Sequence, residues 1–598
     1  MAKSNLRADM SMSSIADAMS KISASPEITD YVDGYENPVA WYRRYKVPRD
    51  KMTNDVLFDN IDMRDITLAQ YDSGDKPESV KWKLFGHNTV ICHEYITQGI
   101  MDQAIKSIGY MEEIVLSITD NDEFLKSIRI ALNHITFSLK GHVMKLCSLD
   151  TENLDRFIML NNMNIVNKSG LFGVQTFFFY EYGLPCAHIT KDCALKAISI
   201  NEAEPEWYYL LARVLTHWQR VCGSSNECSE QEFEAAKMAV KLGNKDHHKL
   251  HLIHIYVRMS KNVRTNNNDK ANYIKEGLKL LKEVMSSNND LLLLKSCLIS
   301  LSKMSCDKYN NLNSFEDVPS IIKTLINKLE KSNNGYVHGA IGNYYLFNKK
   351  DYKKANYHLK KAFDAKNFGS SIDYIYTFFK MNPETPIVEP MLVDLLKVFP
   401  HPVHREKILS LIVSYLILTK DDIIQALKYI PALLNIKNPT CVYSLMTHSV
   451  KFSDHYYKNI NLLDLLSEEL KKALNDTTLT SINQKRVIEV QNKLEMFNKH
   501  VGQLMKEKEH IFGSGFRKVT KKNNTIINKH HTNLRNEKWA RNNNQKDITH
   551  VKNYIKKEDN WRTLKPDTDP KSNIFSRVVN KQISKNEMEV KPHINDTK

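Results

Sequence analysis

A stripe of basic side chains follows one face of a helix predicted over residues 207–220. Arg213, His217 and Arg220 are separated by four and three residues, so they line up along that helix. Guanidinium groups bind phosphate oxygens in a fixed, two-pronged geometry, and a stripe of them on a concave surface would contact an RNA backbone. The same spacing is also typical of a helix face exposed to water, and we give the two interpretations equal weight.

A second group of basic residues follows on the next predicted helix: His247, Lys249, His251, His254, Arg258 and Lys261. Among them Lys249, Arg258 and Lys261 are further candidate RNA contacts. Histidines one helical turn apart can also share a metal ion, but a zinc site needs three or four protein ligands. No cysteine or carboxylate is spaced to complete such a set, so we predict neither a metal site nor a cofactor.

The last part of the chain concentrates positive charge. Residues 511–598 hold 20 Lys and Arg against 9 Asp and Glu, within a net charge of +15 for the whole chain. So polar a segment buries too little apolar surface to offset its ordering entropy, and we expect a disordered basic tail over 512–598. Its candidate RNA contacts combine phosphate-binding cations with one aromatic ring: Arg517, Lys518, Lys521, Lys522, Arg535, Trp539, Arg541, Lys556 and Lys557. A solubilising tail, or a nuclear-import signal over 517–522, is the alternative.

The elements that must position these residues are helices, because apolar residues recur three and four apart through most of the chain. One longer pattern repeats: a large apolar residue, a small one three later, a large one four later, and an apolar or small one three later. It occurs over 101–111, 233–243, 274–284 and 352–362. Small residues let two antiparallel helices approach closely, as stacked helical hairpins require. This arrangement resembles the tetratricopeptide repeat.

The expected fold is therefore all-α, an α-α superhelix of tetratricopeptide-like hairpins with a disordered basic C-terminal tail. We divide the chain into a partly disordered N-terminal arm over 1–54, tetratricopeptide-like repeats over 55–382, degenerate helical repeats over 383–511 and the tail over 512–598. Only 19 glycines and 17 prolines occur in 598 residues, about half of average usage, which argues against sandwiches, barrels and α/β enzymes. A generic amphipathic bundle is the alternative.

One passage resembles a particular family. Glu-Pro-Glu-Trp at 204–207, which follows a helix ending near Ile200 and precedes Ala212, is similar to a step in the interferon-induced proteins with tetratricopeptide repeats. The resemblance covers about residues 80–370 and is one of layout more than identity. It implies a superhelix that grips the 5′ end of single-stranded RNA, 5′-triphosphate RNA included, in a basic tunnel, and a role in innate antiviral defence.

The chain departs from that family at one position that matters for binding. The family's arginine on the helix after this step corresponds to His217, and a neutral imidazole cannot replace a permanently charged guanidinium. Arg213 and Arg220 share the same helix face, so the resemblance is compatible with a basic stripe supplied by neighbours. The long basic tail is not a feature of the family.

Several classes of function are excluded by what the sequence lacks. It contains no G-x-x-x-x-G-K-[ST] loop, no G-x-S-x-G and no H-E-x-x-H, so no enzymatic activity is expected. No apolar run is long enough to cross a membrane, and nine scattered cysteines do not indicate a disulfide framework. We predict a cytoplasmic protein that binds single-stranded RNA, with the tail as a route to the nucleus. The alternative is a scaffold that binds a peptide or a partner protein in the superhelical groove.

Overall fold

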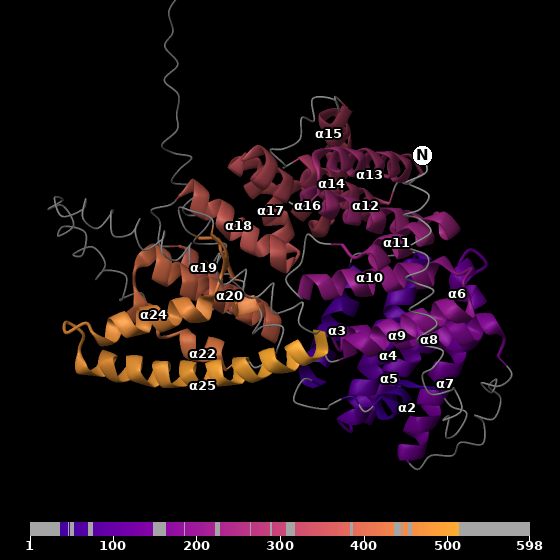
Figure 1. Cartoon of the computed structure of the whole chain (residues 1–598), viewed down its shortest axis with the longest axis horizontal. Coiled ribbons are helices and arrows are strands. Elements are labelled where there is room, and N and C mark those ends of the chain that lie inside the picture. The colour runs from indigo at the N-terminus through magenta and orange to yellow at the C-terminus, as the bar shows by residue number, and fades with distance from the viewer. Residues whose placement is uncertain are drawn as a thin grey trace, which may run out of the picture. The chain divides into compact units, whose positions relative to one another are not determined.

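Helices dominate the described part of the chain in the computed structural model (Figure 1). The structure describes residues 36–512, with gaps at 46, 48–52, 70–75, 148–162, 184–185, 222–227, 263–264, 288–289, 306–316, 383–386, 436–443, 447 and 453–456. The chain divides into two compact units, unit 1 up to Met381 and unit 2 from Asn382. Apart from Phe512, the expected basic tail lies outside the described residues.

Unit 1 is built from helices that bury apolar residues spaced three and four apart. In α5, for example, Ala104, Ile108 and Met111 are buried along one face. In chain order the described helices of this unit are α2 (Pro38–Arg44), α3 (Thr53–Ala69), α4 (Glu78–Thr97), α5 (Met101–Leu116), α6 (Glu123–Ser127), α7 (Arg129–Leu146), α8 (Ile165–Glu181), α9 (Ala187–Ile200), α10 (Pro205–Val221), α11 (Glu230–Gly243), α12 (Asp246–Lys261), α13 (Asn267–Ser287), α14 (Leu291–Ser305), α15 (Asp317–Leu329), α16 (Gly335–Asn343), the π-helical segment η6 (Tyr344–Lys349), α17 (Tyr352–Asp364) and α18 (Phe368–Met381).

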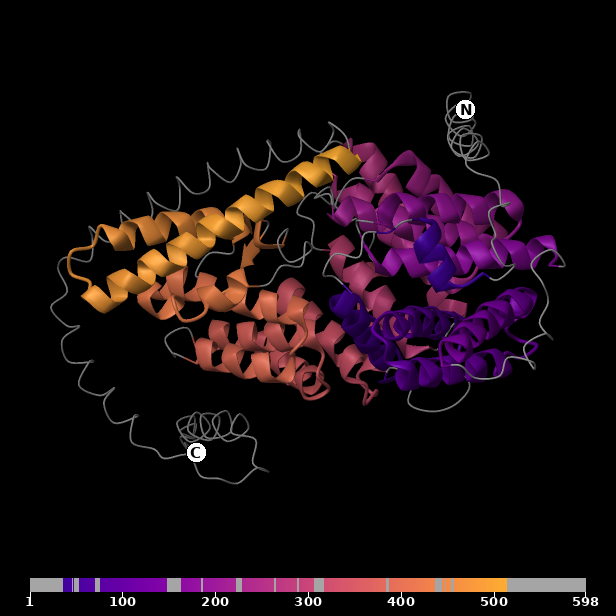
Figure 2. The same cartoon turned by 90° about the horizontal axis from the view of Figure 1, so that it is seen from below.

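The helices of unit 1 form stacked hairpins. α4 pairs with α5, α8 with α9, α10 with α11, α12 with α13 and α16 with α17. The first helices of these hairpins also pack on one another in a row, α4 on α8, α8 on α10, α10 on α12, α12 on α14 and α14 on α16, which we call the inner row. Figure 2 shows these helices, indigo to magenta, from a second side. Stacked hairpins of this kind are a tetratricopeptide-like solenoid, and the predicted fold class is confirmed.

Small residues lie where the paired helices touch, as the repeated pattern predicts. Gly342 of α16 packs so closely on α17 that a Cβ there would overlap the side chain of Leu359. Ala355 is fully buried on α17. In the first hairpin Ala104 is equally buried, and the Cys92 thiol lies 3.7 Å from the Ala104 carbonyl oxygen. Close backbone approach therefore holds both hairpins together, as in other α-α repeats.

The described part of the N-terminal arm packs against the repeats. α2 contacts both α4 and α8. The indole of Trp41 is fully buried against the Phe178 ring, with centroids 5.7 Å apart, and donates its N–H to the Glu36 carboxylate at 2.5 Å. Glu36 also pairs with Arg44 at 2.5 Å. These contacts add apolar surface to the first hairpin of unit 1.

Unit 2 is also mainly helical and contains one small sheet. Its described elements are α19 (Val388–Val398), α20 (Pro402–Tyr415), the π-helical segment η7 (Leu416–Lys420), α21 (Ile423–Ala426), α22 (Ile430–Leu434), β1 (His448–Val450), β2 (Tyr457–Ile460), α24 (Leu462–Leu474) and α25 (Ser481–Phe512). β1 and β2 are antiparallel, with His448 opposite Ile460. The sequence analysis did not anticipate this hairpin, because three- and four-residue strands carry too short a pattern.

Two connectors in different units share one backbone geometry. η6 is followed by Lys350 and η7 by Asp421, and each of these two residues lies in the left-handed region with φ of 56°. The next residue, Asp351 or Asp422, donates its backbone N–H at 3.0 Å to the carbonyl six residues earlier. The same aspartate caps the helix that follows with its side chain.

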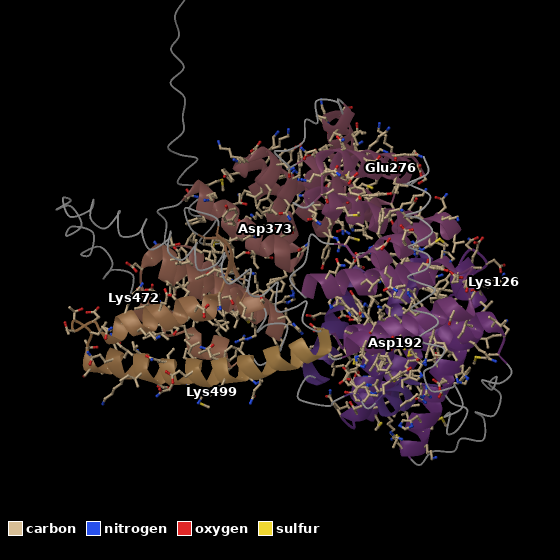
Figure 3. All side chains as sticks on the ribbon, in the orientation of Figure 1. Lys126, Asp192, Glu276, Asp373, Lys472 and Lys499 are labelled. Atoms are coloured by element: carbon tan, nitrogen blue, oxygen red, sulfur yellow. The ribbon has the colours of Figure 1, made fainter. Side chains whose placement is uncertain are left out.

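Charged side chains such as Lys126 and Lys472 project from the helices into solvent (Figure 3). Of the helices that the structure describes, none combines the length and apolar character needed to cross a membrane.

Candidate functional site

A cavity of about 190 Å³ opens on the inner row of unit 1. Its walls come from α3, α4, α6, α10, α12 and α14. α4 and α14 are separated along the inner row by α8, α10 and α12, yet both line this cavity. The row therefore curves, and side chains far apart in the sequence meet at its concave side.

Three cations line this cavity, each from a different helix: Lys83 of α4, Arg213 of α10 and Lys295 of α14. Burial first, and then the positive charges of Arg213 and Lys295, together lower the pKa of Lys83 to about 8. Burial also lowers the pKa of Lys295. Among the described residues, no ion pair joins any of the three to a carboxylate. We call these three residues the basic cluster.

Two tyrosines hold the guanidinium of Arg213. It lies 5.5 Å from the ring centre of Tyr180 and 5.7 Å from that of Tyr209, distances typical of cation–π contacts. Burial alone would lower the pKa of Arg213, but Tyr209, Tyr180 and Glu181 raise it above its usual value. Burial raises the pKa of Glu181 itself to about 7, so its compensating charge is incomplete near neutral pH. Arg213 is thus a permanent cation that the two tyrosines and Glu181 stabilise without a direct ion pair among the described residues.

A neutral histidine completes this side of the site. Burial first, and then the charges of Arg213, Lys83 and Arg64, together lower the pKa of His87 to about 3. The imidazole Nδ1 donates to Asn60 Oδ1 at 2.8 Å, which fixes the tautomer. His87 therefore adds no charge at neutral pH, because burial and, to a smaller extent, the nearby cations disfavour its protonated form.

The start of α10 is anchored by a close contact with α8. Trp207 is fully buried and lies directly over Gly173, where any Cβ would overlap the indole ring. The indole N–H donates to Ser169 Oγ at 3.1 Å. Because Arg213 follows on the same helix, this contact fixes where its guanidinium enters the cavity.

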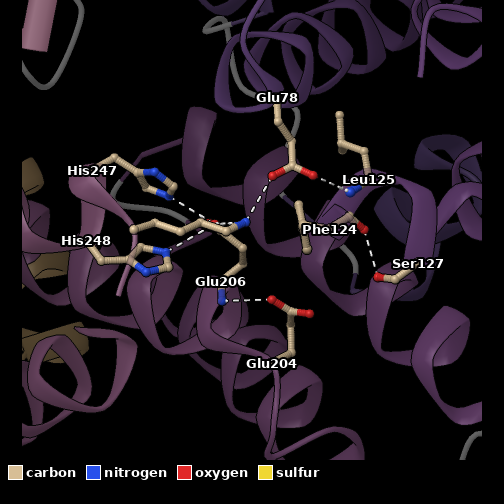
Figure 4. A network of polar contacts seen from close by, with 9 residues as sticks. Glu78, Phe124, Leu125, Ser127, Glu204, Glu206, His247 and His248 are labelled. Atoms are coloured by element: carbon tan, nitrogen blue, oxygen red, sulfur yellow. Dashed lines mark hydrogen bonds and ion pairs between the residues drawn. The ribbon is translucent and has the colours of Figure 1, made fainter. Parts of the chain in front are cut away.

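A second polar cluster borders the cavity, centred on the buried carboxylate of Glu206 (Figure 4). One oxygen, Oε1, lies 2.9 Å from His247 Nε2, 3.1 Å from His248 Nε2 and 3.4 Å from Lys245 Nζ. Lys245 also bonds to Glu78 at 2.9 Å. We call Glu206, His247 and His248 the Glu206 cluster. Burial favours the neutral acid at Glu206, but bonds to both histidines hold its pKa well below the usual range.

Of the candidates on the first stripe, Arg213 lies in the cavity wall. His217 lies next to Tyr180, with ring centroids 5.0 Å apart. Arg220 belongs to α10, but its side chain is outside the described set. Any role of the three in binding RNA stays a prediction.

The charges of the candidate residues on α12 are largely neutralised by carboxylates from neighbouring helices. Arg258 pairs with Glu232 of α11 at 2.5 Å, and Lys249 pairs with Glu283 of α13 at 3.3 Å. Lys261 is the last residue of α12 and is partly exposed. None of the three belongs to the cavity lining. The tail candidates, Arg517, Lys518, Lys521, Lys522, Arg535, Trp539, Arg541, Lys556 and Lys557, all fall outside the described residues.

Sequence reasoning missed Lys83, Lys295 and Glu206. A signal for Lys83 exists, because α4 is buried on nearly all sides and lysines are seldom found within such helices unless their charge has a partner or a function. Glu206 lies 41 residues before His247, so spacing within one helix could not reveal their contact. The cavity is made by curvature of the inner row, which no local pattern encodes.

Comparisons with known proteins assign neither a family nor a ligand to this chain. No model of a known protein family matches the chain, and a search of curated proteins found no match either. Among solved structures, "Human IFIT1 dimer with PPP-AAAA" has 13% identity and a TM-score of 0.38, covering 81% of this chain and 100% of that one. "Human IFIT1 dimer with m7Gppp-AAAA" has 13% identity and a TM-score of 0.37, covering 77% and 96%. Scores this low decide nothing about fold or ligand.

Proposed function

We propose that the cavity of unit 1 binds the phosphate groups at the 5′ end of single-stranded RNA, 5′-triphosphate RNA included. The observation that supports this is the basic cluster: three cations on three helices face one cavity without an ion-paired carboxylate among the described residues. Cations confined together repel one another, and after burial the charges of Arg213 and Lys295 are the causes that lower the pKa of Lys83. A bound polyanion would relieve that repulsion.

The chemistry favours a phosphate chain over an acidic peptide. A 5′-triphosphate concentrates several charges within a few ångströms, whereas the carboxylates of a peptide lie on separate flexible side chains. Arg213 offers a planar, fixed donor set that suits phosphate oxygens, and the two lysines add charge without directional demand. The role proposed is binding, with no catalytic step.

The test uses the full-length chain and three fluorescently labelled single-stranded RNAs of one sequence. They carry a 5′-triphosphate, a 5′-monophosphate or a 5′-hydroxyl group, so any contribution of the basic tail is the same for all three. We expect the triphosphate RNA to bind most tightly, with an affinity that falls as salt rises. Arg213→Met should weaken triphosphate binding about tenfold or more, because a hydrogen bond to a charged group contributes about 1.5–3 kcal/mol.

The matched control is Lys106→Met, which removes an exposed cation from α5, away from the cavity lining. It should leave the preference for the triphosphate end unchanged. Equal affinity for all three RNAs would contradict the proposal. If an acidic peptide bound instead, in a way that Arg213→Met abolished, the scaffold function would replace it. A preference for triphosphate ends would support the antiviral role and cytoplasmic location that the sequence resemblance implies.

A further inference from the structure

Three side chains with the chemistry of metal ligands converge at the edge of the cavity. In the Glu206 cluster, one carboxylate and two imidazoles bring their ligand atoms within 4.8 Å of one another. Two histidines and one glutamate are a ligand set that binds zinc in proteins, with a fourth position left open. The set joins two helices, since Glu206 is in the first turn of α10 and both histidines are in the first turn of α12.

We propose that Glu206, His247 and His248 form a binding site for a divalent transition-metal ion, with Zn²⁺ as its representative. None of its three ligands belongs to the basic cluster, but Glu206 and His247 line the same cavity, so metal binding is tested in the absence of RNA.

The distances between the ligand atoms are close to those that zinc requires. Ligand atoms 2.0–2.1 Å from a tetrahedral zinc lie about 3.3 Å from one another. Glu206 Oε1 is 2.9 Å from His247 Nε2 and 3.1 Å from His248 Nε2. Shifts of a few tenths of an ångström would bring these two distances to the tetrahedral value, and the two histidine ligand atoms lie within 4.8 Å of each other.

Burial and packing hold these ligands in place. The side chains of Glu206 and His248 are 8% and 0% exposed, and that of His247 is 23% exposed. Tyr209 packs on both imidazoles, with ring centroids 5.0 and 5.2 Å away. Because Glu206 and His247 also line the cavity, an ion has a route of entry, and its open coordination position would face that space.

The local charge also favours a cation. Glu78, Glu204 and Glu206 meet at this point, and Lys245 is the ammonium that bonds to two of them. Lys245 Nζ lies 3.4 Å from the same Glu206 oxygen that both histidines contact, so a cation is already accommodated beside the ligand set. A metal ion would have to compete with the charge of Lys245, and this gives the proposal a gain-of-function test.

The experiment is a calorimetric titration of the full-length chain with ZnCl₂, repeated with Co²⁺ to read the coordination geometry from its visible spectrum. We expect saturable binding and the spectrum of four-coordinate Co²⁺. Changes to residues that only support metal ligands commonly cost about 10–100-fold in metal affinity. Glu206→Gln combined with His247→Asn removes ligands themselves, so it should weaken Zn²⁺ binding by more than that. His251→Asn, one turn further along α12 and also packed on Tyr209, is the control and should bind as the unmodified chain does.

Lys245→Met is the second variant, and it does not depend on a loss that misfolding could mimic. Removing a competing positive charge so close to the ion should increase affinity for Zn²⁺ by about tenfold or more. Binding that is identical in the unmodified chain and the Glu206→Gln, His247→Asn variant would overturn the proposal, since the metal would then be held elsewhere. An unchanged affinity in Lys245→Met would overturn it as well.

Discussion

Arg213 and Arg258 belong to neighbouring helices, α10 and α12, but within the described residues only Arg258 forms an ion pair with a carboxylate. Arg258 pairs with Glu232, a carboxylate that is itself fully buried, whereas Arg213 faces the cavity between two tyrosine rings. The difference is that α11 supplies the direct ion-pair partner Glu232 to Arg258, whereas Glu181, the carboxyl that acts on Arg213, has its pKa raised by burial to about 7. A basic residue on a repeat is therefore a candidate for ligand binding only where the neighbouring helix leaves its charge unpaired.

The largest expected effect comes from breaking the paired arginine. Glu232→Gln should lower the free energy of unfolding by about 3–5 kcal/mol, because Arg258 would remain nearly buried without a compensating charge. Urea unfolding followed by circular dichroism measures this. Arg213→Met should change the same quantity by less than about 1 kcal/mol, since no ion pair is lost.

A double replacement sharpens that comparison. Glu232→Met with Arg258→Met removes both charges, and buried ion pairs replaced by apolar groups commonly cost little. The double variant should regain most of the stability lost in Glu232→Gln. If it were as unstable as the single variant, packing rather than charge would explain the effect, and the contrast between the two arginines would fail.

The second effect is a pH dependence due to Lys83. Its folded-state pKa of about 8 lies below the ordinary value of 10.5, so between these values the unfolded chain binds more protons than the folded one. Stability of the ligand-free protein should therefore rise with pH across that interval, by about 1–3 kcal/mol. Thermal unfolding at closely spaced pH values measures the slope.

Lys83→Met should flatten this slope and stabilise the free protein below pH 8, because the repelling charge is gone. Binding of triphosphate RNA should show the opposite trend and weaken above pH 8, as the lysine loses its proton. A slope that survives Lys83→Met would assign the proton to another group and would break the link between repulsion and binding.

The smallest expected effect comes from adding a second cation beside Arg213, the arginine without an ion pair in the described part of the chain. His217→Arg places a permanent charge one turn after Arg213, next to Tyr180. If the new guanidinium reaches one more phosphate, the slope of log affinity against log salt concentration should steepen by about 0.7, the value for single strands. Lys261→Arg, which keeps the charge at the end of α12, should leave the slope unchanged.

Local patterns predict the helices well and the site poorly. The spacing of small and large residues in 101–111 and 352–362 anticipates α5 and α17, because each hairpin is stabilised by contacts between neighbours in sequence. Arg213 was found in the same way, from spacing on one helix. Lys83 and Lys295 were not, because they approach Arg213 only through curvature accumulated over several hairpins. The pairing of Arg258 escaped notice for the same reason.

The matching connectors after α16 and α20 show that one local geometry can join helices in hairpins of either unit. In both, a π-helical segment leads to a left-handed residue, and an aspartate then begins the next helix with the same backbone bond. The same connector geometry therefore occurs in unit 1 and in unit 2. Residues 345–351 should therefore be exchangeable with 416–422 as a graft that keeps the aspartate cap of the following helix.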